Sequence, residues 1–321
     1  MATFLSEKYL HFLEKSDQQL LVLSGMTAAL GCLFPSPYLG ILIVLELGKP
    51  PKSYMENVIV LSFSAICSFV MYYCVVDFTY VHSIPQTPSA HLLSVQWEFE
   101  NWHISTAFVI GVVSSGMSLC TIIIIGICKT IFTRLRTRFG AVSPLLGQVV
   151  PPLVGGAVIG CVNWALPLTV GSGSMACLAI LKFGAQGQLD TNLLVATAFA
   201  KLFCLGVSMG CGFVGGFVFP QIMVAIIAGT LMNHFYDYVP YGLCVGCFVA
   251  AYPGAIIPAP FTLAGLSIFL FYFGVYQTAS ILVATTTSYL IFCGSGVMGG
   301  IVSKAQARND AMEARAAESK A

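Results

Sequence analysis

The chain has 321 residues, of which 57% are hydrophobic and only 8% are Asp, Glu, Lys or Arg. This charged share is about a third of that in a soluble domain, so the composition excludes a water-soluble protein. A disordered chain requires low hydrophobicity and high charge, so the hydrophobic share excludes disorder. A nucleic-acid-binding protein requires a basic electrostatic field, which a net charge of +1 does not supply. What remains is a polytopic membrane protein.

Long stretches without a single charged residue divide the chain. One helical crossing of a bilayer needs about 20 apolar residues. The charge-free stretches, together with the apolar segments 18–47 and 104–128, predict roughly eight to ten membrane segments. We therefore expect a polar segment at 1–17, a transmembrane domain at 18–303 and a polar cytoplasmic tail at 304–321. The charge-free stretches are 57–76, 139–181, 202–236 and 238–303.

The connecting loops predict the orientation. The loop at 48–56 carries Lys49 and Lys52, and the stretch CKTIFTRLRTRFG at 128–140 carries one Lys and three Arg. The loop at 78–103 has no Lys or Arg and carries Glu98 and Glu100. Because basic loops stay in the cytoplasm, the acidic loop is predicted to lie outside.

Glycine and proline interrupt the apolar runs at 34–40, 149–156, 170–175, 210–220 and 252–260. A helix broken within lipid leaves backbone groups unpaired, so such breaks survive only inside protein or along a polar cavity. Several breaks in one chain are typical of transporters and channels. The alternative is a passive bundle with proline kinks.

An internal repeat supports the transporter interpretation. Residues 28–46 (AALGCLFPSPYLGILIVLE) and 250–269 (AAYPGAIIPAPFTLAGLSIF) share two alanines, a P-x-P motif, an aromatic residue and an apolar run. Such repeats indicate two related halves, often inverted, with the substrate site where they meet. The first-half equivalent of the Gly-rich stretch at 215–220 would fall before residue 1.

The stretch GCGFVGGFVFP at 210–220 contains a candidate anion site. Gly215 and Gly216 lack a Cβ and let the backbone approach a ligand, and Phe217 and Val218 are predicted to begin the next helix. The first N–H groups of a helix have no intrahelical partner and form the positive end of its dipole, so they can bind an anion. The alternative is a tight packing corner, which is the favoured interpretation for the break at 170–175.

Four motifs, in order, resemble the ClC family of voltage-gated chloride channels and chloride/proton exchangers. GGFVFP at 215–220 is similar to the family's G-G-x-F-x-P filter motif, and Ala259–Pro260 follows at a matching distance. FPSPYLGILIVLE at 34–46 resembles its N-A-P-L-x-G-x-L-F-x-x-E-E segment, and LPLTVGSGSM at 166–175 resembles its L-P-x-x-x-G-x-G turn.

The resemblance implies an all-α inverted-repeat fold with broken and re-entrant helices, and a homodimer in which each subunit has its own pore. It implies that the N–H groups of Phe217 and Val218 hold chloride, while Gly215 and Gly216 shape the turn. Chloride or a similar small anion and the lipid bilayer are the expected partners. No cofactor or metal is expected, and no enzyme, since neither an HExxH motif nor paired intramembrane carboxylates occur.

The chain also departs from the family pattern. The family's G-S-G-I-P and G-K/R-E-G-P motifs, its CBS domains and a clear match for its pore tyrosine are absent, and Val218 replaces the usual Phe. We therefore expect the first part of the N-terminal half to be missing. Glu46 matches the first glutamate of the family's E-E pair, but Leu47 replaces the proton-transfer glutamate, which favours a passive channel over an exchanger.

Two further residues are candidates for the anion pathway. Glu46 is one, through the motif that it matches. Lys201 is a lone cation in an apolar run, and it is expected either to tune an anion path or to snorkel to the interface. The alternative function is a non-conducting structural or regulatory subunit, because the first filter half and the gating glutamate are absent.

Overall fold

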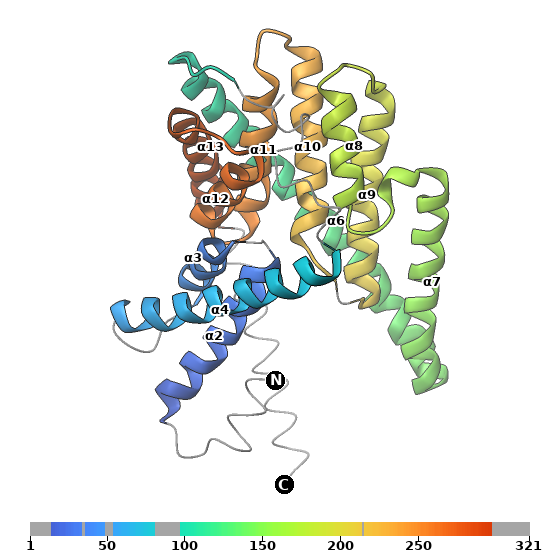
Figure 1. Ribbon diagram of the computed structural model, residues 1–321. Helices are drawn as coiled ribbons and strands as arrows, with labels where there is room; N and C mark the ends of the chain where they lie inside the picture. The colour runs from blue at the N-terminus through green and yellow to red at the C-terminus, as the bar shows by residue number, and fades with distance from the viewer. Residues whose placement is uncertain (1–13, 34–35, 49–53, 81–96, 214, 297–321) are drawn as a thin grey trace.

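The computed structural model describes residues 14–33, 36–48, 54–80, 97–213 and 215–296. Every regular element in these ranges is helical, which confirms the predicted all-α class. In Figure 1, α8, α9, α10 and α11 stand side by side with nearly parallel axes, and α4 lies lower in the view, where it packs against α2 and α3. The elements are α2 (Lys15–Leu33), α3 (Pro37–Leu47), α4 (Tyr54–Tyr80), α6 (Trp102–Val142), α7 (Pro144–Ala165), η1 (Pro167–Thr169), α8 (Ser174–Gly184), α9 (Thr191–Cys211), α10 (Val218–Phe235), α11 (Tyr241–Ile256), α12 (Pro260–Phe271) and α13 (Val275–Gly294).

Five of the described helices are long and apolar enough to cross a membrane: α4, α6, α7, α9 and α10. Three more apolar helices, α3, α11 and α12, have only 10–17 residues. The eight to ten segments predicted from the sequence therefore include short helices, because glycine and proline divide the apolar runs. The tail at 304–321 lies outside the described residues.

The centre of the fold is formed by α10 and α11, which pack against each other. In α10 every residue from Pro220 to Ile227 is buried, and in α11 every residue from Gly242 to Ala255 is buried. A helix that is apolar on all sides has to be enclosed by other helices. The neighbours α6, α12 and α13 pack against α11, and α8 and α9 pack against α10.

The basic stretch at 128–140 was expected to be a loop, but it is helical. It forms the last turns of α6, which runs for 41 residues, about 60 Å at the rise of an α-helix. Lys and Arg have high helix propensity, so nothing in this stretch ends the helix before Ser143, whose backbone is extended.

The break predicted at 149–156 is wrong, because α7 continues through Pro151 and Pro152. A proline removes one backbone hydrogen bond, but a membrane helix tolerates this where neighbouring groups satisfy the freed carbonyl. The glycine beside these prolines serves packing instead. A Cβ at Gly155 would lie 2.6 Å from Sγ of Cys211 on α9.

The two copies of the internal repeat form a pair of antiparallel helices, α3 and α12. Pro37 begins α3 and Pro260 begins α12, so both P-x-P motifs mark a helix start. The end of α3 meets the start of α12 through Glu46, whose carboxylate accepts the Phe261 N–H at 2.9 Å. At the opposite end the rings of Tyr38 and Phe269 lie 5.7 Å apart. Equivalent helices thus run in opposite directions, as an inverted repeat requires.

Candidate functional site

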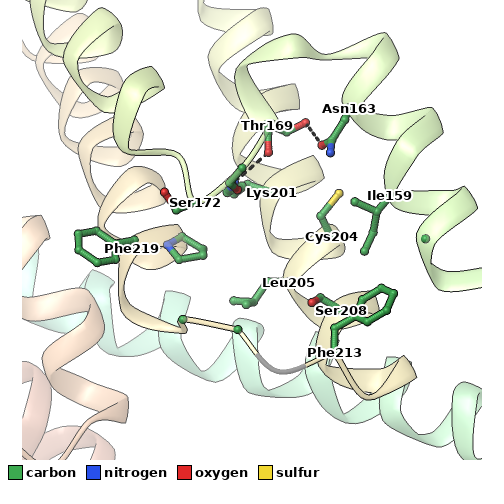
Figure 2. A pocket seen from close by; sticks show the side chains of 15 residues that line it. Ile159, Asn163, Thr169, Ser172, Lys201, Cys204, Leu205, Ser208, Phe213 and Phe219 are labelled. Atoms are coloured by element: carbon green, nitrogen blue, oxygen red, sulfur yellow. Dashed lines mark hydrogen bonds between the residues drawn. The ribbon is translucent and has the colours of Figure 1, made fainter. Parts of the chain in front are cut away.

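A cavity of about 470 Å³ lies where α7, α9, the segment after η1 and the start of α10 meet. Figure 2 shows the side chains of α9 along the middle of this cavity, with α7 on one side and Phe219 of α10 on the other. The cavity is lined by Gly156, Ile159, Asn163, Thr169, Gly171, Ser172, Lys201, Cys204, Leu205, Ser208, Phe213, Gly215, Gly216, Phe219 and Pro220.

The start of α10 forms one end of the cavity. The preceding helix, α9, ends at Cys211, and Gly212 follows in the left-handed conformation with a φ of 97°. Phe217 is the N-cap of α10 and Val218 its first residue, within one residue of the predicted start. The N-cap side chain makes no capping hydrogen bond. The first N–H groups of α10 therefore receive no cap from that residue, and the positive end of the helix dipole faces this region.

Gly215 and Gly216 are exposed and line the cavity. A Cβ built on either glycine meets no atom within 4 Å, so neither is packed against a neighbouring helix in the described structure. Phe217 and Val218 are half-buried and do not line the cavity, whereas the next two residues, Phe219 and Pro220, do. The structure thus brings the two predicted glycines to the cavity. The two residues predicted to supply N–H donors follow the glycines in the chain and do not themselves line the cavity.

Lys201 is the charged side chain of the cavity, and it is only 3% exposed. Its Nζ donates hydrogen bonds to the backbone carbonyls of Thr169, at 2.9 Å, and Gly171, at 2.7 Å. Figure 2 shows Lys201 extending from α9 toward Thr169. The ionisable groups that interact with it electrostatically are the thiols of Cys204 and Cys177, and no carboxylate of the described residues forms an ion pair with it. The side chain is held inside the fold rather than at an exposed helix end.

The break at 170–175 serves both packing and the cavity. Gly173 has a φ of 93° and begins α8, and a Cβ there would lie 2.7 Å from Sδ of Met223. Gly173 therefore packs closely on α10, as the favoured interpretation expected. Gly171 and Ser172, however, line the cavity, which brings the start of α8 to the same place as the start of α10.

Several polar residues of the cavity were not predicted from the sequence. Asn163 of α7 and Thr169 of η1 lie side by side, with Thr169 Oγ1 2.8 Å from Asn163 Oδ1 and 2.7 Å from the Leu166 carbonyl. Ser208 of α9 lines the cavity as well. Their signal in the sequence is a polar side chain within an apolar run, which does not say what the side chain faces.

Glu46, the second candidate for the pathway, does not line this cavity. Its carboxylate accepts hydrogen bonds from the N–H groups of Phe261, at 2.9 Å, and Thr262, at 2.8 Å, and from the Thr262 hydroxyl. It therefore caps α12, whose own N-cap is Ala259. A role for Glu46 in the pathway stays a prediction. Within the described ranges no three His, Cys, Asp or Glu side chains could together hold a metal ion.

Comparison with known proteins decides the family. The family model for voltage-gated chloride channels matches residues 1–293. The chain belongs to this family, the ClC family. A ClC protein with these apolar helices is an integral, multi-pass membrane protein.

Two similar proteins place this ClC chain among known folds. The crystal structure of a slow cyanobacterial Cl⁻/H⁺ antiporter matches 92% of the chain with a TM-score of 0.74 and 18% sequence identity. An uncharacterized protein of Methanocaldococcus jannaschii is 22% identical over 233 residues, which are 72% of this chain. The chain spans 65% of the solved structure and 53% of the archaeal relative. The likeness to the solved structure confirms the ClC fold.

Proposed function

We propose that this ClC chain carries chloride or a similar small anion across a membrane, with the cavity beside α10 as part of the route. The observation that carries the proposal is the cavity's buried Lys201, which has two carbonyl partners and no carboxylate partner in the described structure. A buried charge is costly unless it is paired. An anion in the cavity would supply the missing pair.

The helix starts around the cavity add to the attraction. Both α8 and α10 begin there, and each helix N-terminus carries roughly half a positive charge. Gly215 and Gly216 leave open space in which an anion can approach the backbone, and the N–H groups of Phe217 and Val218 are the proposed donors. The site thus attracts an anion with two helix dipoles and one ammonium group, which bind it less permanently than a cluster of fixed charges.

Passive conduction is the mode that we propose. Leu47 stands where the family's exchangers have the proton-transfer glutamate, and a leucine side chain carries no proton. Glu46 is held by the start of α12, where its two oxygens accept three hydrogen bonds. A carboxylate fixed in this way supports a structural role better than a mobile proton carrier. Two copies of the chain are the proposed assembly.

Purified protein in liposomes tests the proposal. With a chloride gradient, and with valinomycin to carry potassium, we expect chloride efflux that follows the membrane potential without net proton movement. The mass of the purified particle gives the number of copies. Proton movement driven by the chloride gradient would contradict passive conduction. No efflux from a folded sample would contradict transport and favour the non-conducting subunit.

A further inference from the structure

A second hollow, of about 580 Å³, lies on α6, α10 and α11, away from the anion cavity. Its deeper walls are apolar: Val109, Ile110 and Val113 of α6, Ala228 and Met232 of α10, and Phe248 of α11. Residues nearer the helix ends carry hydroxyl groups: Ser105, Thr106, Tyr236 and Tyr238. We call this hollow the α6–α10 groove. Its lining changes from polar to apolar along its length, as an amphipathic ligand requires.

The depth of the groove matches one leaflet of a bilayer. From Ser105 to Val113 helix α6 advances about 12 Å. Half of the hydrocarbon core of a bilayer is about 15 Å. The apolar walls are open, since Val109 is 53% and Val113 46% exposed. An acyl chain that enters at Ser105 would therefore lie along these valines for most of its leaflet.

The polar end of the groove, at Ser105, Thr106, Tyr236 and Tyr238, is its mouth. The aromatic rings at this mouth indicate where the membrane surface lies. The rings of Trp102 and Tyr238 are 6.1 Å apart, and those of Tyr236 and Tyr238 are 6.0 Å apart. Trp and Tyr gather at the level of the lipid head groups, because their rings are apolar and their N–H or O–H groups reach water. The mouth of the groove is thus at head-group level and its apolar walls lie in the hydrocarbon.

The charges at the mouth are negative. The segment 97–101 contains Glu98 and Glu100, the segment 236–240 contains Asp237, and neither segment has a Lys or Arg. Trp102 Nε1 donates to Glu100 Oε2 at 2.6 Å, which holds this carboxylate beside the aromatic rings. Such a mouth repels an anionic head group and attracts an ammonium group.

We propose that the α6–α10 groove binds one zwitterionic phospholipid with an ammonium head group, such as phosphatidylethanolamine. One acyl chain lies between Val109, Val113 and Met232. The ammonium group lies near Glu100 and Asp237. This site is separate from the proposed anion cavity, and it does not depend on whether the chain conducts.

Photocrosslinking in nanodiscs tests the site. The probe is phosphatidylethanolamine with a diazirine in its acyl chain, in an equal mixture of phosphatidylethanolamine and phosphatidylglycerol. We expect the label on peptides that contain residues 105–113 and 228–232. Ala228→Phe fills the groove and should remove most of this label, and Val109→Trp should do the same from the opposite wall. The control is Ala157→Phe, on an exposed position of α7 outside the groove, which should leave the label unchanged.

The head-group preference has its own test. The same diazirine on phosphatidylglycerol should label the groove of the unchanged protein weakly. Glu100→Gln combined with Asp237→Asn should remove the difference between the two lipids. Equal labelling of the groove by both lipids in the unchanged protein, or labelling spread evenly over the exposed faces of α7 and α9, would overturn the proposal. Chloride flux is not part of either readout, so failure here leaves the proposed function standing.

Discussion

Replacing Lys201 with methionine separates charge from volume at the anion cavity. Methionine is similar in length to lysine and is also unbranched, so it can occupy the same space. It removes the positive charge and the donors to the carbonyls of Thr169 and Gly171. The effect on anion binding therefore measures what the charge contributes.

The size of the effect follows from the dimensions of the cavity. A volume of about 470 Å³ corresponds to a sphere with a radius of about 5 Å, which we take as the separation between an anion at its centre and Nζ of Lys201 on its wall. At an effective dielectric constant of about 20, their attraction is about 3 kcal/mol. Lys201→Met should therefore weaken anion binding roughly 100-fold.

The variant should still fold. Each hydrogen bond from a charged donor contributes about 1.5–3 kcal/mol. Against this loss, burial of an ammonium group costs several kcal/mol, which the methionine does not pay. The two effects largely offset each other, so the free energy of unfolding should change less than either effect alone.

Isothermal titration with chloride, and chloride efflux from liposomes, measure the change. Lys201→Gln is the matched control, because it keeps an N–H donor and removes the charge. If the charge attracts the anion, the Met and Gln variants should lose binding to a similar extent. If Lys201 only holds the Thr169–Gly171 segment, the Gln variant should retain binding. Unchanged binding in both variants would refute a role for Lys201 in anion attraction.

Three further substitutions test the site and the fold. Gly216→Leu should abolish chloride efflux without unfolding the protein, because the new side chain enters open space beside the cavity. Gly160→Leu, in open space on α7, is the control. Efflux retained by the Gly216 variant would exclude this glycine from the route. Glu46→Ala removes the cap of α12 and should lower the free energy of unfolding by about 1–2 kcal/mol in detergent melts, with a smaller loss for Glu46→Gln; equal stability of all three proteins would contradict the capping role. Gly155→Val places a Cβ 2.6 Å from Sγ of the buried Cys211 and should lower the free energy of unfolding by about 1–3 kcal/mol. Gly160→Val should lower it less, because nothing lies within 4 Å of a Cβ there. Similar melting temperatures for the two valine variants would show that α7 moves to accept the side chain.

Several local features of the fold could be predicted from the sequence, because they rest on short-range chemistry. The start of α10 was predicted within one residue, because two signals mark a helix N-terminus there. Glycines precede Phe217, and Pro220 lies in the first turn of the helix. The P-x-P motifs at Pro37 and Pro260 likewise mark the starts of α3 and α12. At Pro151 and Pro152 the same reasoning failed, because α7 continues through both prolines.

The residues that share the anion cavity could not be predicted together. They come from α7, η1, α9 and the start of α10, which are distant in the sequence. Lys201 was noticed as a lone cation, but its partners are backbone carbonyls, which every residue has and no sequence motif marks. Only the packing of η1 against α9 shows that the ammonium group turns inward.

The sequence by itself determined the membrane class, the scarcity of charge and the positions at which several helices begin, since composition and local backbone chemistry set these properties. The tertiary structure decided which of those features act together. It brought the starts of α8 and α10 to one cavity with Lys201, and it directed Glu46 to the cap of α12 instead. The physical reason is that an anion is bound only where a helix dipole, a buried ammonium group and an open glycine face the same space. The packing of helices that are distant in the sequence determines which space each group faces.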